Sequence, residues 1–276
     1  MNAYICTACG TQFSPSASPP VDCPICLDER QFVPPSGQAW TTLDALARTH
    51  MNSFRQMEQG LIAFATIPHF AIGQRAFLIR TPHGNVLWDC IALLDDAAIE
   101  IIRGLGGVSA IAISHPHYYT TMVDWSRAFN DAPVYLHAKD QKWIMRPDDC
   151  VRLWDGDSKQ LVDGITLVRC GGHFAGGTVL HWRDGGGKKG VLLPGDVVMV
   201  VPDRRYVSFF RSFPNIIPLS GPSVRQIGAI LAPYEFDAIY GGFFGRDLPK
   251  GGKEAVMRSV ERYVSIVTGD GSAELE

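Results

Sequence analysis

The sequence predicts an α/β protein preceded by a small cysteine-rich segment. Three observations support this fold class. From residue 61 onward, short apolar runs typical of strands alternate with amphipathic segments typical of helices. Isolated histidines and an aspartate directly follow several of these apolar runs. Four cysteines lie in two close pairs near the amino terminus, in a segment that otherwise looks unlike the rest of the chain.

Composition narrows the class of protein. With 276 residues the chain has room for one large domain and a small appendage. The net charge of −3 disfavours nucleic acid or a membrane surface as a partner, because such partners usually need a basic patch. No apolar run approaches the roughly 20 residues of a membrane span. No secretory signal is visible, and Cys90, Cys150 and Cys170 are isolated, so we expect reduced thiols and a cytoplasmic protein.

The elements are predicted in order from their periodicity. A first amphipathic helix is predicted over 41–57, capped by Thr41, with apolar residues at helical spacing. Strands follow at 61–67, 76–80 and 86–90, then a helix at 95–103 and a strand at 108–113. A further strand–helix alternation covers 121–130, 134–136 and 138–145. The last segments are strands at 165–170, 178–183 and 191–193, a helix at 222–231, a strand at 237–240 and a helix at 253–267.

The cysteine-rich segment predicts a metal site. Its ligands form two Cys-x-x-Cys pairs that can complete a tetrahedron around one ion: Cys6, Cys9, Cys23 and Cys26. The segment resembles zinc ribbons and rubredoxin-like domains, and proline punctuation near residue 35 predicts a module over 1–35 and a second domain over 36–276. Gly10 follows the first pair, as in rubredoxins, but Leu27 replaces the glycine expected after the second. This departure favours structural zinc, with iron as the alternative.

Four further polar residues are candidates for metal ligands. His115 and His117 follow an apolar strand at a point where a proline breaks the extended chain. His173 stands among glycines, which let the backbone turn sharply and present the imidazole. Asp196 ends another apolar strand, where burial of a carboxylate is costly unless it has a partner. Imidazole and carboxylate are ligands that zinc accepts, and also iron or manganese.

These motifs resemble the metallo-β-lactamase superfamily, whose signature is HxHxDH, then a lone His, a lone Asp and a final His. The resemblance runs from about residue 61 to the end of the sequence and implies an αββα sandwich. It also implies that His115, His117 and His173 hold a first metal ion and that Asp196 is the carboxylate that bridges two ions. Asp89 matches a strand-end Asp that often supports a ligand histidine in the family. An ordinary turn acid is the alternative there.

The chain departs from the signature at the second metal. Tyr119 and Thr120 stand where the motif has Asp and His, and no histidine follows His181. We therefore predict a single ion in this site. The missing Asp also helps to orient the attacking water in family enzymes, so any mechanism borrowed from two-metal relatives needs revision.

Three functions remain open from the sequence. The first is a hydrolase in which one zinc ion lowers the pKa of water to about 7, Asp196 accepts the proton, and Tyr119 or Tyr118 donates a hydrogen bond to the developing oxyanion. Loop packing is the alternative role for these tyrosines. The second is a mononuclear-iron oxidoreductase with a rubredoxin-like domain, similar to persulfide dioxygenases. The third is a non-catalytic metal- or ligand-binding protein. The fold alone does not choose a substrate.

For the arginine- and aromatic-rich segment we expect a role in binding, and for the remaining histidines a structural role or exposure to solvent. Residues 204–214 interleave arginines with aromatics, which indicates either a site for an anionic or aromatic small molecule or a homodimer interface. His50 is expected on the apolar stripe of the first helix and His137 in a structural role. His181 is expected to face outward from a strand, and His83 to be a solvated turn residue. His69 lies where the superfamily often places a loop at the rim of the active site, although a structural role is favoured there too.

Overall fold

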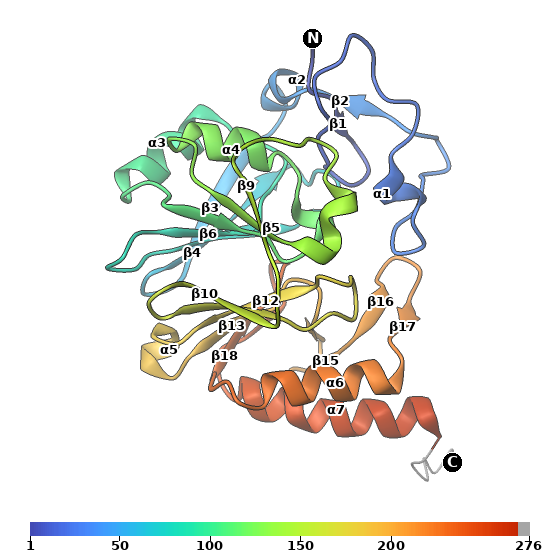
Figure 1. The fold of residues 1–276 in the computed structure, drawn as a ribbon, viewed down its shortest axis with the longest axis vertical. Coiled ribbons are helices and arrows are strands. Elements are labelled where there is room, and N and C mark those ends of the chain that lie inside the picture. Colours follow the sequence, from blue (N-terminus) through green and yellow to red (C-terminus); the bar gives the residue numbers. More distant parts are fainter. Residues whose placement is uncertain (270–276) are drawn as a thin grey trace. The chain divides into compact units, whose positions relative to one another are not determined.

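The computed structural model describes residues 1–269, which divide into two compact units (Figure 1). Unit 1 begins at Met1 and ends at Asp155, and unit 2 begins at Gly156. The cysteine-rich segment belongs to unit 1, and the module boundary near residue 35 stays a prediction. Within the described residues, no helix is long and apolar enough to cross a bilayer.

Unit 1 is built on a seven-stranded sheet with the order β3-β4-β5-β6-β7-β8-β9. Its strands are β3 (Met51–Glu58), β4 (Leu61–Ile67), β5 (Arg75–Ile79), β6 (Val86–Trp88), β7 (Ala110–Ala112), β8 (Val134–His137) and β9 (Val151–Trp154). The strands from β3 to β6 are antiparallel, and those from β6 to β9 are parallel. The carboxyl ends of β6 and β7 therefore lie at one edge of the sheet.

The helix predicted over 41–57 is wrong beyond its first turns. Helix α2 covers only Leu43–Ala47, and Thr42 rather than Thr41 caps it, accepting a hydrogen bond from the backbone of Ala45 at 3.3 Å. From Met51 the chain forms β3, which pairs with β4 along its length and stacks Phe54 on Phe64 with ring centroids 5.1 Å apart. Tertiary pairing overrides the helical spacing because each strand residue gains a ladder partner.

The helices of unit 1 are short and are held by side-chain hydrogen bonds. They are α3 (Asp96–Gly104), α4 (Met122–Ala128) and the 3₁₀ turns η1 (Pro116–Tyr118) and η2 (Ala138–Trp143). Asp95 caps α3 by accepting from the backbone of Ala98 at 2.7 Å, which confirms the predicted helix start. In α4, the buried indole of Trp125 donates to the carbonyl of Ile91 at 3.0 Å and packs near Phe64 of the sheet.

The cysteine-rich segment is packed into unit 1. Strand β1 (Ile5–Cys6) pairs with β2 (Trp40–Thr41), and the short helix α1 (Pro24–Leu27) carries the second cysteine pair. Ile5 is fully buried in an apolar cluster with Leu46 and Leu93. The amide of Gln12 also donates to Asp124 at 2.7 Å, and Arg146 donates to both Gln12 and Asp124. The segment is thus anchored to α4 by a polar network.

Unit 2 contains a six-stranded sheet with the order β10-β11-β12-β13-β18-β19. Its strands are β10 (Ser158–Val162), β11 (Ile165–Arg169), β12 (Thr178–Trp182), β13 (Val191–Leu193), β18 (Ala238–Tyr240) and β19 (Asp247–Leu248). Two small hairpins join β14 (Met199–Val200) to β15 (Val207–Ser208) and β16 (Phe210–Ser212) to β17 (Ile217–Pro218). A short turn of helix, α5 (Gly185–Lys188), links β12 to β13. The predicted strands over 165–170, 178–183 and 191–193 are confirmed.

Two helices complete the core of unit 2 and confirm the helices predicted at the end of the chain. Helices α6 (Gly221–Leu231) and α7 (Gly252–Thr268) run side by side (Figure 1). Their buried apolar faces join those of β11, β12, β13 and β18 in one cluster. Gly228 permits the close approach of the two helices, since a Cβ there would stand 3.0 Å from the Val260 side chain.

Candidate metal centres

The four cysteines that were predicted to bind a metal ion lie together in one cluster of thiols. All four are at most 2% exposed, and their sulfurs lie within 4.8 Å of one another. The sulfurs of Cys6 and Cys26 are 3.6 Å apart, as are those of Cys9 and Cys23. A disulfide needs about 2.05 Å, whereas four thiolates at about 2.3 Å from one zinc ion stand about 3.8 Å apart. The geometry therefore fits a metal site.

Local backbone structure brings the two cysteine pairs into this arrangement. In the first pair, Gly10 adopts φ +82° and donates its amide to the carbonyl of Cys6 at 2.8 Å, which closes a tight turn. In the second, Leu27 donates to the carbonyl of Cys23 at 3.0 Å around helix α1. Hydrogen bonds from Cys23 and Cys26 lower the pKa of the Cys6 thiol. Hydrogen bonds from Cys23 raise the pKa values of the Cys9 and Cys26 thiols, so only part of the cluster favours the thiolate form that binds metals.

The first histidine pair lies where β7 ends. His115 and His117 are 2% and 1% exposed, and their ring centroids are 5.1 Å apart at an angle of 75°. One ring nitrogen of each lies within 4.8 Å of the other. Pro116 begins the 3₁₀ turn η1 immediately after His115, so the chain leaves the extended conformation between the two residues. This turn lets two alternate residues present their rings to one side.

A hydrogen-bond chain orients His115. The carboxylate of Asp89 accepts the backbone amide of Ser114 at 2.7 Å, and the Ser114 hydroxyl lies 2.8 Å from Nδ1 of His115. Asp89 follows β6 and Ser114 follows β7, so the two meet where parallel strands end at one sheet edge. The role expected of Asp89 is therefore exerted through Ser114, which sequence reasoning missed. Its position directly before the first histidine is the only signal in the sequence.

Tyr119 and Thr120, which replace the motif's Asp and His, are both buried. Burial raises the pKa of the Tyr119 phenol well above its ordinary value, and the nearby charge of Asp140 raises it further. The phenol therefore stays protonated and keeps a hydrogen to donate. Thr120 adopts φ +35°, and within residues 1–269 its buried hydroxyl has no hydrogen-bond partner. Neither position supplies the carboxylate or imidazole that the signature uses for a second ion.

The second donor pair lies in unit 2, at one edge of its sheet. His173 belongs to the loop between β11 and β12, where Gly171 and Gly172 adopt φ +69° and +78°. Asp196 follows β13 through Gly195, which also has a positive φ. Because Leu180 of β12 is paired with Leu193 of β13, the two loops emerge at the same edge.

The His173 and Asp196 side chains approach each other without a close hydrogen bond. They are 1% and 3% exposed, and Nε2 of His173 lies 3.9 Å from a carboxylate oxygen of Asp196. The opposite ring nitrogen, Nδ1, lies 3.2 Å from the carbonyl of Phe210, which fixes the ring. A separation of 3.9 Å is too long for a hydrogen bond, but two ligands of one zinc ion stand about 3–4 Å apart. This pair therefore fits the geometry of metal ligands.

The structure gives the other histidines separate roles. His50 lies after α2, with Nδ1 2.8 Å from the Thr49 hydroxyl, and not on a helical stripe. The outward orientation expected for His181 is wrong: the residue is 8% exposed and its Nε2 lies 2.7 Å from the carbonyl of Glu235. Nδ1 of His137 accepts a hydrogen bond from the backbone amide of Lys139, which is consistent with the structural role predicted for this residue. His69 and His83 are exposed.

Comparison with known proteins gives a sequence relative and a fold. The chain is 43% identical to the uncharacterized protein YmaE of Bacillus subtilis (strain 168) over 272 residues, which is 98% of each chain. No protein-family model matches the sequence.

Solved structures of metallo-β-lactamases share the fold at low sequence identity. DIM-1 metallo-β-lactamase exposed to ceftazidime matches with a TM-score of 0.57 and 12% identity, over 77% of this chain and 97% of that one. FIM-1 from Pseudomonas aeruginosa, in the mono-zinc form, matches with a TM-score of 0.55 and 14% identity, over 77% and 96%. The chain therefore has the metallo-β-lactamase fold, with a four-cysteine cluster near its amino terminus, and it belongs to the same family as YmaE.

Proposed function

We propose that the protein is a metal-dependent hydrolase whose active site holds one ion through His115, His117, His173 and Asp196. The observation that carries this proposal is that both donor pairs are buried in loops at strand ends of a metallo-β-lactamase fold. Three imidazoles and one carboxylate form a donor set that suits metal ligation.

The identity of the residues around His117 supports a single ion. A second ion would need donors at the positions of Tyr119 and Thr120, and these supply a protonated phenol and a hydroxyl. No histidine follows His181 in the sequence to complete a second set. FIM-1, which shares the fold, has been solved in a mono-zinc form, so the fold accommodates one zinc ion.

The chemistry follows from the donors and their neighbours. A bound zinc ion lowers the pKa of water and polarises a carbonyl or phosphoryl oxygen. Asp196 accepts the proton of the attacking water, and the protonated Tyr119 donates a hydrogen bond to the oxygen that becomes negative. Ser114 and Asp89 hold the ring of His115 in one orientation throughout. The ion in the cysteine cluster, also proposed to be zinc, has a structural role.

The substrate and the cellular compartment are part of the same proposal. A small molecule is expected as the substrate, because the net charge of −3 disfavours nucleic acid. All seven cysteines are free thiols, which suits a reducing compartment such as the cytoplasm.

Hydrolysis of a panel of chromogenic esters, thioesters, lactones and phosphodiesters by the zinc-loaded protein tests the proposal. We expect one class to be hydrolysed, and His173→Ala and Asp196→Ala each to lower kcat at least about 100-fold while the circular dichroism spectrum is retained. His83→Ala, which changes an exposed histidine, is the matched control and should keep full activity. Equal activity of all three variants would show that the site is misassigned. A red protein with iron–thiolate absorption would favour an oxidoreductase instead.

A further inference from the structure

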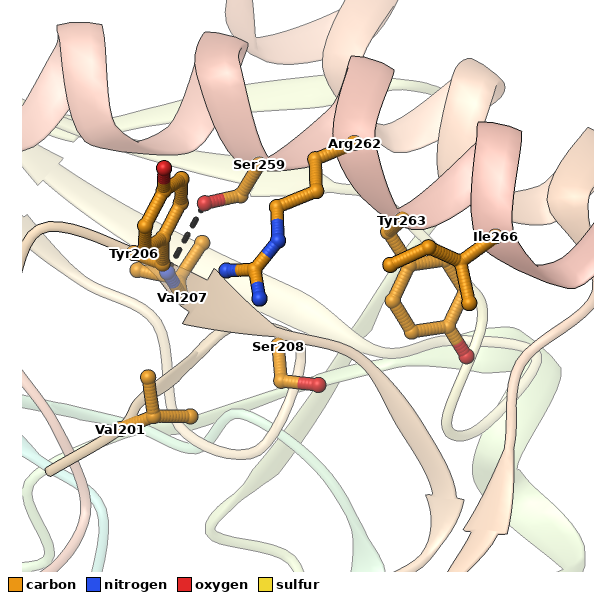
Figure 2. Close-up of a pocket in the computed structure, with 8 residues that line it drawn as sticks. All are labelled: Val201, Tyr206, Val207, Ser208, Ser259, Arg262, Tyr263 and Ile266. Carbon is orange, nitrogen blue, oxygen red and sulfur yellow. Dashed lines mark hydrogen bonds between the residues drawn. The ribbon is translucent and has the colours of Figure 1, made fainter. Parts of the chain in front are cut away.

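A pocket of about 240 Å³ lies between helix α7 and the β14–β15 hairpin of unit 2 (Figure 2). Neither His173 nor Asp196 is among its lining residues, so it is separate from the donors proposed to bind the ion. It is lined by Val201, Tyr206, Val207, Ser208, Ser259, Arg262, Tyr263 and Ile266. The lining combines apolar side chains with one guanidinium group. The pocket is therefore a candidate site for a ligand that has an apolar body and a negative charge.

The walls of this pocket are fixed by hydrogen bonds. Helix α7 contributes Ser259, Tyr263 and Ile266 at helical spacing, so they share one face. The hydroxyl of Ser259 accepts the backbone amide of Val207 at 2.9 Å, a bond drawn in Figure 2. The phenol of Tyr263 donates to the carbonyls of Phe209 and Leu219 at 3.0 and 2.9 Å. The hairpin and the helix are thus tied together on both sides, and little ordering is left for a ligand to impose.

Positive charge is concentrated beside the pocket. Three guanidinium groups surround the ring of Tyr206, at 5.8 Å for Arg205, 5.5 Å for Arg258 and 4.1 Å for Arg262. Arg205 is paired with Asp203 at 2.8 Å, and the charge of Arg262 also helps to lower the pKa of the Asp203 carboxyl. The guanidinium of Arg262 contacts the face of the Tyr206 ring. An anion that binds here would gain charge-assisted hydrogen bonds and relieve the repulsion among the cations.

The position of Arg262 directs this charge into the pocket. Figure 2 shows its guanidinium extending from α7 toward the strand that carries Val207 and Ser208. Ser208 is half-buried and also lines this pocket, so it adds a hydroxyl group to the lining. The two side chains come from different elements, and both line the pocket.

The rest of the pocket is apolar. Ile266 is 61% exposed although it lines the cavity, and Val201 is half-buried opposite the helix. A ligand that covered Ile266 would remove apolar surface from water and gain about 25 cal/mol for each Å² buried. A purely inorganic anion would leave this surface uncovered.

We propose that this pocket binds a small organic monocarboxylate, with its carboxylate on Arg262 and Ser208 and its apolar body against Val201 and Ile266. The volume of the pocket sets the size of the ligand. At about 25–30 Å³ for each non-hydrogen atom, close to the volume of a water molecule in the liquid, the pocket holds about eight to ten such atoms. A medium-chain fatty acid such as octanoate has this size and chemistry.

Isothermal titration of the full-length, zinc-loaded protein with octanoate tests the proposal. Acetate, which has the charge without the chain, and 1-octanol, which has the chain without the charge, are the ligand controls. We expect octanoate to bind with a dissociation constant of about 1 mM or lower and both controls at least about tenfold more weakly. Octanoate binding no tighter than either control would overturn the assignment.

Variants locate the binding to this pocket. Arg262→Gln keeps most of the side-chain length and should weaken octanoate binding at least about tenfold, as should Ile266→Asn. Arg225→Gln changes an exposed arginine on α6 and is the matched control, with unchanged binding expected. His173→Ala should also bind octanoate normally, which separates this pocket from the proposed metal site. Normal binding by Arg262→Gln and Ile266→Asn, or loss of binding in His173→Ala, would contradict the proposal.

Discussion

The cysteine cluster and the histidine–aspartate donors differ in how far apart the chain places their members. Cys6 and Cys26 bracket a short segment that lies wholly in unit 1, and their sulfurs are already 3.6 Å apart. The other donors are divided, with His115 and His117 in unit 1 and His173 and Asp196 in unit 2. The first set is therefore local, whereas the proposed second site draws its donors from both units.

This difference suggests separate roles for the two proposed ions. Four thiolates close the coordination shell of an ion, and such sites contribute directly to folding stability. Three imidazoles and one carboxylate that can be displaced leave room for chemistry. We therefore expect the loss of a cysteine to affect stability most, and the loss of a histidine to affect activity with little change in stability.

Cys9→Ser should produce the largest effect on stability. Three thiolates and a hydroxyl no longer hold the ion tightly, and the turn at Gly10 packs directly beside Thr120 and Ala92 of unit 1. We expect the loss of one metal ion per chain, a destabilisation of more than about 4 kcal/mol and a melting temperature lower by about 10 °C. Elemental analysis measures the metal content, and calorimetry measures the stability and the melting temperature. Cys150→Ser, at a buried cysteine outside the cluster, is the control and should keep its metal.

Arg146→Ala tests whether the cysteine-rich segment is anchored by its polar network. The variant leaves the carboxylate of Asp124 and the amide of Gln12 without their buried cation, and should cost about 2–4 kcal/mol in urea denaturation. Arg127→Ala removes an ion pair with Asp148 in which the arginine is 56% exposed, and should cost at most about 1 kcal/mol. Equal effects of the two substitutions would mean that the network does not anchor the segment.

Asp89→Ala tests whether the hydrogen bonds from Asp89 through Ser114 hold His115 in its orientation. Without the carboxylate the amide of Ser114 loses its acceptor, and the hydroxyl that bonds to His115 is no longer held in place. We expect a loss of about 1–3 kcal/mol in stability and metal binding at the histidines weaker by about 10–100-fold. Asp89→Asn keeps an acceptor oxygen, so a competition assay with a chelator should show a smaller loss. Unchanged metal affinity in Asp89→Ala would refute the supporting role.

The smallest effect is a pH dependence that arises from His181. Burial lowers the pKa of this imidazole below its ordinary value of 6.5. Its charged form is disfavoured in the folded state, so the unfolded state binds more protons as the pH falls below about 6.5, and stability decreases. Urea denaturation at pH 7.5 and pH 5.5 should show this decrease, and His181→Gln should reduce it. A decrease of the same size in His181→Gln would assign it to other groups.

The parts of the molecule that sequence reasoning predicted are those set by local spacing. The cysteine pairs, the strand at 61–67 and helix α7 follow from spacing and periodicity alone. The prediction of a helix over 41–57 failed because Phe54 and Met57 match helical spacing by coincidence, while the pairing of β3 with β4 decides the conformation of this segment. The short strands β9 and β10 were not predicted, because β9 is fixed by parallel pairing with β8 and the mostly polar β10 by its hairpin with β11.

For the candidate metal site, too, the sequence predicted only part of the structure. The order of the histidines and the aspartate indicates which residues are donors, but the sequence does not reveal what orients them. Ser114 acts through a hydroxyl and a backbone amide, and the partner of His173 is the carbonyl of Phe210, which any residue at that position supplies. Contacts made through the backbone leave no signature in side-chain identity.

The metal content of purified variants tests the central claim, that the divided donors hold a single ion distinct from the one in the cysteine cluster. Elemental analysis of the zinc-loaded protein should give two ions per chain. His115→Ala and Asp196→Ala should each give one, and the double variant should also give one, because the two halves hold the same ion. Three ions in the wild-type protein, or two in either single variant, would contradict this account.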